Sequence, residues 1–336
     1  MTGINCGQMI GLQRLHVRVP ASTSNLGPGF DFLGLAIGLF LDASASEAPD
    51  GSSTGHGVRY LGLADDGCDG AAWPPEDDLV LRSLAAYEAA SGASLPKLLL
   101  TIRSEIPVGR GFGSSGAAVA ATLLLAASAH GASAQQSGCG SALPREALLA
   151  LALQLEGHPD NGTASLLGGL TLAVPTPNDA EGEMAIVQPP VHESLAGAVA
   201  WPDAPLFTPE ARAALPETVA FADAVENPRR LALLLEGLRT GDARLLRLGV
   251  RDQLHERHRR ALVHGSDAAV EAAYRAGALA ACLSGAGSGV IALGPASSME
   301  RVASEMAACL RGGQGRAVPL VRSAPTVETQ EIVNPN

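Results

Sequence analysis

Lysine is almost absent from this sequence: Lys97 is the only one in 336 residues, although basic residues number 23. A P-loop binds phosphate through a Gly-Lys-Ser/Thr motif, so the lack of a suitably placed lysine excludes that type of nucleotide site. Any anion that the chain binds must be held by arginine, histidine, hydroxyl groups or the backbone N–H groups at a helix start.

Aromatic and charged residues are also scarce, at 3% and 17% of the chain, whereas hydrophobic residues make up 46%. The core must therefore consist of Leu, Val, Ile and Ala, and the composition indicates a soluble globular protein rather than a disordered one. The length is sufficient for two domains. A net charge of −11 argues against nucleic acid or an anionic membrane as a partner.

The cysteines indicate neither a disulfide framework nor a metal site, because their number is odd and no two have the spacing of a metal motif. Free thiols are typical of a reducing compartment, so we expect a cytoplasmic protein. No charged segment followed by an apolar one marks a signal peptide at the N-terminus. The most apolar run, 119–127, is too short to span a bilayer and predicts a buried helix. The cysteines are Cys6, Cys68, Cys139, Cys282 and Cys309.

A glycine-rich loop within residues 106–122 is the most informative feature that is present. Glycines occupy positions 109, 111, 113 and 116, Ser114 and Ser115 follow the third of them, and an apolar strand at 98–102 precedes the loop. Glycine allows the backbone to come close to a ligand, and the serines can cap a following helix. Free N–H groups and the positive end of that helix would then form a phosphate site.

The same loop has two other interpretations. The spacing Gly111-x-Gly113-x-x-Gly116 matches the fingerprint of dinucleotide-binding folds, which also requires an acidic residue about 20 positions further on. No Asp or Glu occurs between Glu105 and Glu146, which argues against a dehydrogenase. A tight turn before a buried helix remains open on the loop alone. Otherwise the loop is a phosphate cradle without lysine.

Residues 107–118 resemble the second motif of the GHMP small-molecule kinases, which usually reads Pro-x-x-x-Gly-Leu-Gly-Ser-Ser-Ala. This chain has Phe112 for the usual Leu and Gly116 for a usual Ala. Both replacements keep an apolar residue and a small residue in their places.

Three further segments extend the resemblance. Residues 19–36 contain Ser-Asn-Leu-Gly-Pro-Gly-Phe-Asp, and residues 156–161 read Glu-Gly-His-Pro-Asp-Asn; both are typical of the homoserine kinases within this family. Residues 283–290 resemble the third GHMP motif, usually Ser-Gly-Ala-Gly-Pro-Ser, with Ser288 and Gly289 in its last two positions. Motifs that match in order along nearly the whole chain are far more specific than any one of them.

The resemblance implies an α+β fold of two domains, a ribosomal-protein-S5-like N-terminal domain and a ferredoxin-like C-terminal domain. We expect the nucleotide-binding domain at residues 14–190 and the second domain, which completes the substrate site, at 191–325. The polar, proline-bounded stretch 176–190 is the candidate boundary. Periodicity and caps predict strands 58–63 and 195–201, helices 78–90, 144–156 and 242–259, and a flexible connection at 131–143.

The resemblance also implies ATP and Mg²⁺. Ser115 and Glu156, an acid at a helix end where a cation would offset the dipole, are the expected Mg²⁺ ligands. Helix capping and a solvent-facing glutamate are the alternative roles for the serines and for Glu156. The expected ATP-binding residues are Asp78, near the adenine, and Pro107, Val108, Gly109, Arg110, Gly111, Phe112, Gly113, Ser114 and Ser115.

The implied substrate-binding residues are Asn25, Asp31, His158, Asn161, Arg212 and Arg259. Asp31 can accept a hydrogen bond from an ammonium group, and the arginines can hold a carboxylate in a bidentate fork. The alternative roles are an Asx cap for Asp31, a structural role for His158 and solvated charges for the two arginines. Asn161 stands where some GHMP kinases have a catalytic Asp, and with Ser115 and Glu156 it forms the expected catalytic set. Since no convincing general base is present, positioning and charge stabilisation are expected to carry most of the catalysis.

The activity that the resemblance implies is ATP-dependent phosphorylation of the L-homoserine hydroxyl, giving O-phospho-L-homoserine, in threonine biosynthesis. A GHMP kinase for another small hydroxylated metabolite is one alternative. A non-catalytic nucleotide-binding protein on the same scaffold is another. The expected partner is a small-molecule substrate, and a homodimer remains open beside a monomer.

Overall fold

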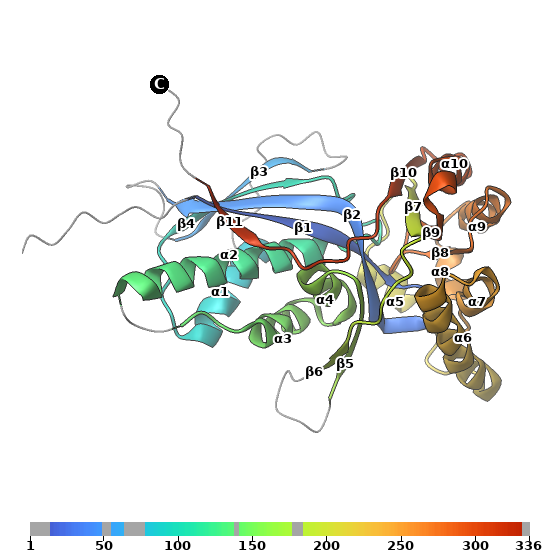
Figure 1. The fold of residues 1–336 in the computed structure, drawn as a ribbon, viewed down its shortest axis with the longest axis horizontal. Helices are drawn as coiled ribbons and strands as arrows, with labels where there is room; N and C mark the ends of the chain where they lie inside the picture. The colour runs from blue at the N-terminus through green and yellow to red at the C-terminus, as the bar shows by residue number, and fades with distance from the viewer. Residues whose placement is uncertain (1–13, 49–54, 64–77, 138–140, 177–183, 331–336) are drawn as a thin grey trace, which may run out of the picture.

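The structure is a computed structural model that describes residues 14–48, 55–63, 78–137, 141–176 and 184–330. Its elements form two layered units, each with a sheet and helices (Figure 1). Helices and strands are mixed without regular alternation, so the α+β prediction is confirmed.

The first sheet has the strand order β11-β1-β2-β4-β3, and β5 extends it from the far part of β2 with β6 at its edge. All its pairs are antiparallel except β3 with β4, which run parallel. Its strands are β1 (Arg14–Asn25), β2 (Gly29–Glu47), β3 (Gly57–Leu63), β4 (Leu98–Ser104), β5 (Leu170–Pro175), β6 (Met184–Val187) and β11 (Val327–Gln330).

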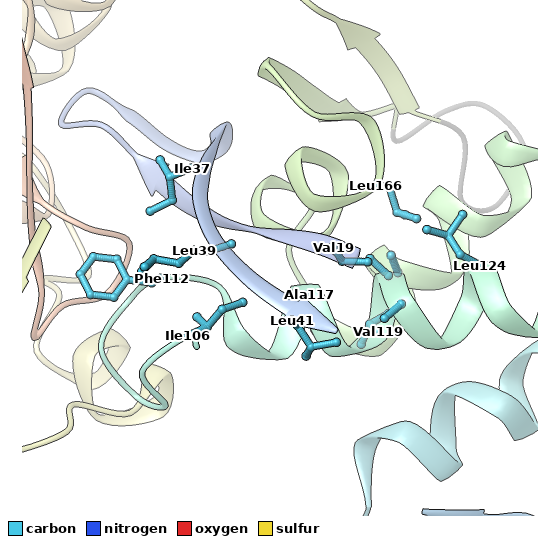
Figure 2. Packing of buried hydrophobic residues seen from close by; sticks show 14 of the residues in the cluster. Val19, Ile37, Leu39, Leu41, Ile106, Phe112, Ala117, Val119, Leu124 and Leu166 are labelled. Carbon is cyan, nitrogen blue, oxygen red and sulfur yellow. The ribbon is translucent and has the colours of Figure 1, made fainter. Parts of the chain in front are cut away.

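Four helices cover one face of this sheet (Figure 1). They are α1 (Leu79–Ser91), α2 (Ser114–Ser137), α3 (Arg145–Glu156) and α4 (Asp160–Leu167). The strand β1 alternates outward Arg and His with buried Leu and Val, as a strand with one covered face requires. Figure 2 shows Val19, Leu39 and Leu41 of the strands and Val119 and Leu124 of α2 in the interior that this packing encloses.

The second sheet has the antiparallel order β10-β7-β9-β8, which is the 4-1-3-2 order of a ferredoxin-like domain. Its strands are β7 (Leu195–Trp201), β8 (Ala280–Leu283), β9 (Val290–Pro295) and β10 (Gln314–Val318). Its helices are α5 (Thr208–Ala213), α6 (Phe221–Thr240), α7 (Ala243–Gly249), α8 (Glu256–Arg260), α9 (Ser266–Arg275) and α10 (Ala296–Ala307).

The two faces of this second sheet serve different cores. Ala198 and Ala200 of β7 pack with α9 and α10 in a core of their own. Val199 and Trp201, which point to the other side of the strand, belong to the large core that includes β1, β2 and α2. Because successive side chains of β7 point to opposite faces, one face of this strand packs in the second domain and the other in the large core. The strand thereby joins the two domains through one continuous apolar interior.

Several predicted elements need correction. The connection expected at 131–143 is helical as far as Ser137, and the helix expected at 242–259 is divided into α7 and α8. Helix α4 and strand β11 were not predicted. Strand β6 lies inside the stretch 176–190 that was expected to separate the domains. The strands expected at 58–63 and 195–201 and the helices expected at 78–90 and 144–156 are confirmed to within one residue.

Helix α2 also corrects the argument about membranes. Its segment 114–135 is long and apolar enough to cross a bilayer, by length and composition. The helix instead packs against β1, β2, α1 and α4, and its residues Ala117, Val119 and Leu125 are fully buried. Burial in the core, rather than insufficient length, accounts for its apolar sequence.

The Ser284–Gly289 segment between β8 and β9 packs directly on the glycine loop of the first domain. The Gly289 N–H donates to the Arg110 carbonyl at 3.0 Å, and the Ser284 hydroxyl donates to the Gly111 carbonyl at 2.7 Å. A Cβ at Gly289 would lie 2.5 Å from both the Arg110 carbonyl oxygen and Cζ of Phe112. Gly289 therefore accommodates Phe112, and the two departures from the GHMP motifs are in contact.

We expect Gly289→Ala to lower the free energy of unfolding by about 1–3 kcal/mol, because a Cβ overpacks this contact. Adding Phe112→Leu removes the contact with the ring but leaves the one with the Arg110 carbonyl. The free energy of unfolding should therefore fall by less in the double variant than the sum of the decreases in Gly289→Ala and Phe112→Leu. Urea unfolding measures all three. Gly131→Ala in α2 is the control: its Cβ would meet only Ala142, at 3.8 Å, and should not destabilise. Additive losses would contradict the proposed compensation.

Candidate active site

The glycine loop requires glycine because the chain approaches the Ser284 backbone at Gly111 and the Ser22 side chain at Gly113. Gly109, Gly111 and Gly113 have φ angles of 67°, 74° and 66°, in the left-handed region. A Cβ at Gly111 would lie 1.9 Å from the Ser284 carbonyl oxygen, and one at Gly113 would lie 2.2 Å from Oγ of Ser22. The loop ends where α2 begins, so its N–H groups and the helix start face the same space.

That space is a cleft of about 280 Å³ between the domains. Six of the predicted ATP-binding residues line it together: Val108, Gly109, Gly111, Gly113, Ser114 and Ser115. The opposite wall comes from residues 206–209 and 285–287 of the second domain. The cleft therefore combines the lysine-free phosphate cradle with a second wall, of which the third motif supplies residues 285–287, while residues 206–209 were not anticipated from the sequence.

Three other residues of the predicted ATP site support the loop from behind. The Arg110 guanidinium donates to the carbonyls of Pro202, Val108 and Asp203, which fixes the loop to the second domain. Phe112 is buried with its ring edge against Trp201, at 5.8 Å between centroids. Pro107 is also buried. Any contact of these residues with a nucleotide would come from their backbone.

Asp78 is the N-cap of α1. Its Oδ1 accepts from the N–H groups of Val80 and Leu81, and its Oδ2 accepts from the Tyr60 hydroxyl at 2.7 Å. Burial and the bond to Asp78 raise the pKa of Tyr60. The carboxylate therefore has a capping role, and its contact with adenine stays a prediction.

Ser115, which lines the cleft, and Glu156 lie together although they come from different helices. The Ser115 hydroxyl donates to Oε1 of Glu156 at 2.8 Å, while Oε2 is buried without a hydrogen-bond partner. Burial raises the pKa of Glu156 to about 7, and the charge of His158 and the Ser115 bond offset only part of this. Gly116 and Gly162 leave room for Oε2, since a Cβ at either would come within 3.0 Å of it.

This pair fits a divalent cation. A buried carboxylate oxygen without a partner is stabilised by a positive charge, and Mg²⁺ is usually held by one or two protein oxygens together with substrate phosphates. Among the described residues no group of three or more His, Cys, Asp or Glu side chains could hold a metal. A two-ligand site completed by phosphate is consistent with that finding.

All six predicted substrate-binding residues line one small hollow that adjoins the cleft. Its volume is about 30 Å³. It shares His158, Asn161, Thr208 and Ala286 with the larger cleft. The lining comprises Ser24, Asn25, Asp31, His158, Asp160, Asn161, Thr208, Arg212, Arg259 and Ala286.

Asp160 holds the two polar residues where the hollow meets the cleft. Its buried Oδ1 accepts from Nδ1 of His158 at 2.7 Å and from the Asn161 N–H at 2.7 Å. Burial alone would lower the pKa of His158, but the hydrogen bond and charge of Asp160 outweigh it and raise that pKa. The Asn161 amide also accepts from Ser22 at 3.0 Å, so its orientation is fixed on two sides.

Asn25 has a structural role beside its predicted role in binding. Its amide donates to the Gly285 carbonyl at 2.9 Å and accepts from the Asp31 N–H at 2.9 Å. Asn25 and Asp31 both have positive φ, at 69° and 63°. The side chain of Asn25 thus joins the third motif to the turn that presents Asp31.

Both predicted arginines reach the hollow from the second domain. Arg212 makes two bonds of 2.9 Å to the carboxylate of Asp31. Arg259 is only 2% exposed, lies 5.0 Å from the centroid of Phe30, and has an Nε without a partner. His255 stacks on the same ring at 4.8 Å. The hollow is therefore lined by two arginines and by two carboxylates, Asp31 and Asp160.

Several lining residues were missed by sequence reasoning. Thr208 and Pro209 lie outside the motifs found in the sequence, and Asp160 was recognised only as part of a motif. Phe30 and His255 lie next to predicted residues in the same motifs, but nothing in their spacing indicates that they support Arg259. Their roles arise from contacts between residues more than 200 positions apart.

The chain is similar over most of its length to known kinases. Residues 78–169 match the family described as GHMP kinases N terminal domain, and residues 234–312 match GHMP kinases C terminal. The homoserine kinase of Prochlorococcus marinus (strain MIT 9515) is 38% identical over 283 residues, which is 84% of each chain. That of Synechococcus sp. (strain CC9902) is 40% identical over 283 residues, again 84% of each.

The solved structures agree. The crystal structure of homoserine kinase from Cytophaga hutchinsonii matches with a TM-score of 0.76 and 25% identity, covering 97% of this chain and 100% of that one. The two-domain fold that the motifs implied is thereby confirmed, as is an ATP-dependent small-molecule kinase. The chain belongs to the GHMP kinase family and, within it, to the homoserine kinases.

Proposed function

We propose that this protein transfers the γ-phosphoryl group of ATP to the side-chain hydroxyl of L-homoserine, as a step in threonine biosynthesis. The observation that carries the proposal is the hollow beside the phosphate cleft, in which Arg212, Arg259 and Asp31 meet. Homoserine carries one carboxylate and one ammonium group, and this set of charges matches both. The proposed location is the cytoplasm, and a homodimer stays open.

The nucleotide would be held by the backbone and hydroxyl groups. N–H groups of the glycine loop and the start of α2 favour negative charge, and Ser114 and Ser115 add donors. Glu156 and Ser115 would hold Mg²⁺, which when bound neutralises charge on the β- and γ-phosphate oxygens. The chain's own contribution is to fix the phosphates at the edge of the hollow.

The substrate side would act by positioning. Asn161 borders both the cleft and the hollow, so an acceptor hydroxyl beside it would face the γ-phosphate. Asp160 already accepts from His158 and Asn161, which makes it an orienting group rather than a free base. Fixed donors around the transferred group then supply the stabilisation, in line with the sequence analysis.

An assay of ADP release with ATP, Mg²⁺ and L-homoserine tests the proposal. Turnover with homoserine supports it. Turnover of another hydroxylated metabolite in a panel of acceptors, with none of homoserine, would favour a different GHMP kinase. Nucleotide binding without any turnover would favour a non-catalytic protein.

Glu156→Gln should cut kcat and raise the Mg²⁺ concentration needed for half-maximal rate, because an amide is a poorer magnesium ligand than a carboxylate. Steady-state kinetics across a Mg²⁺ titration measures both. Glu146→Gln, at the exposed start of the same helix, is the matched control and should leave both unchanged. Normal metal dependence in Glu156→Gln would remove Glu156 from the metal site.

The same variant should be more stable than the parent in EDTA at pH 8. The carboxyl has a pKa of about 7 in the fold against 4.5 ordinarily, so the folded parent binds more protons than the unfolded chain between these values. Its stability therefore falls as the pH rises from about 4.5 to 7, and the glutamine variant avoids this loss. The difference in Tm between the two proteins should shrink towards pH 5, and a constant difference would contradict the buried charge.

Arg212→Ala and Arg259→Lys should each raise the KM for homoserine by roughly ten- to a hundredfold, the loss expected for a charge-assisted bond of about 1.5–3 kcal/mol. Lysine is used at position 259 because the side chain is buried. The KM for ATP should hardly change. Arg229→Ala, on the 70% exposed Arg229 of α6, is the control. An unchanged homoserine KM would place the arginine outside the substrate site.

A further inference from the structure

The ion pair between Asp31 and Arg212 spans the two domains. Asp31 lies near the start of β2 in the first domain, and Arg212 lies on α5 in the second. Both bonds of the pair are 2.9 Å, so the guanidinium fork is filled by the Asp31 carboxylate. The charges that a zwitterionic substrate needs are thus paired with each other.

The hollow is too small for an amino acid while this pair is closed. Its volume of about 30 Å³ is room for one or two water molecules, whereas homoserine has eight non-hydrogen atoms. The two charged side chains are among its walls. A substrate that occupies the hollow itself, and not only the adjoining cleft, must therefore displace part of its walls, which include the Asp31–Arg212 pair.

The backbone at Asp31 is fixed more strongly than the helix that carries Arg212. Asp31 follows a turn fixed by Asn25, whose amide accepts the Asp31 N–H. The two side chains are about equally exposed, at 38% for Arg212 and 36% for Asp31. Arg212, however, has a long side chain on a helix of only six residues. Arg259 is buried below them and keeps its place between His255 and Phe30. Arg212 is accordingly the partner that can move.

We propose that Asp31 and Arg212 form a gate that opens by ion-pair exchange with a zwitterionic α-amino acid. The substrate carboxylate takes the Arg212 fork, and the substrate ammonium takes the Asp31 carboxylate, so that each charge exchanges one partner for another. A ligand with only one charge leaves Asp31 or Arg212 without its partner. The gate thereby selects hydroxylated α-amino acids, which carry both charges. This inference rests on the proposed function.

Two half-ligands separate the gate from ordinary contacts. 4-Hydroxybutyrate is homoserine without its ammonium group, and 3-aminopropan-1-ol is homoserine without its carboxylate. Asp31→Asn should bind 4-hydroxybutyrate more tightly than the parent, by up to about fivefold. The ligand then no longer has to break the exposed ion pair between Asp31 and Arg212. The same variant should bind homoserine more weakly. Calorimetric titration in buffer without ATP measures binding in the absence of turnover.

The mirror variant and a control complete the test. Arg212→Gln should bind 3-aminopropan-1-ol more tightly than the parent, since Asp31 is released. Glu210→Gln removes one exposed negative charge from the helix that carries Arg212 and should leave the affinity for all three ligands unchanged. Melting temperatures identify any variant that fails to fold, and the other variant then decides.

Opposite gains for the two half-ligands in the two variants support the gate. Weaker or unchanged binding of 4-hydroxybutyrate by Asp31→Asn overturns it, as does an equal gain in Glu210→Gln, which would indicate a general effect of net charge. Homoserine turnover by the parent separates these results from a failure of the proposed function. A parent that neither binds nor phosphorylates homoserine overturns both.

Discussion

The close contact between two backbone segments, the glycine loop and the third motif, is the constraint on which the site depends. Gly111 lies so near the Ser284 carbonyl that no side chain fits between them, and the hydroxyl of Ser284 bonds to the Gly111 carbonyl. Through this contact the second domain defines one wall of the phosphate cleft. The same contact brings Arg212 and Arg259 within reach of Asp31, which belongs to the other domain.

A phosphate site without lysine places unusual demands on the rest of the chain. Backbone N–H groups cannot move toward a ligand as a lysine side chain can, so the loop has to be held in its final shape. Arg110 contributes to this by bonding three carbonyl groups, and Phe112 by packing on Trp201. Arg110 and Phe112, which the motif suggests as ATP-binding residues, thus support the loop. The motif serves both phosphate binding and the shape of the loop.

The sequence predicted the α+β class and the central strand–loop–helix, and the six residues that it proposed for substrate binding line one hollow. Motifs report local backbone needs and specific chemistry, which is why these features could be found. It did not predict that Asp31 would pair with Arg212, or that Asp160 would orient His158 and Asn161. These are contacts across the fold, and a one-dimensional pattern contains no signal for them.

The order of the chain has a consequence for synthesis on the ribosome. Strand β1 emerges first, but one of its two neighbours, β11 at residues 327–330, emerges last. Until β11 has been made, residues 14–17 of β1 present an edge of unpaired N–H and C=O groups, which is the kind of edge on which chains aggregate. The first domain is therefore completed only after the second has left the exit tunnel. A stop codon or a bulky fusion placed before Val327 would prevent β11 from pairing with β1. That edge would then stay unpaired in the finished protein.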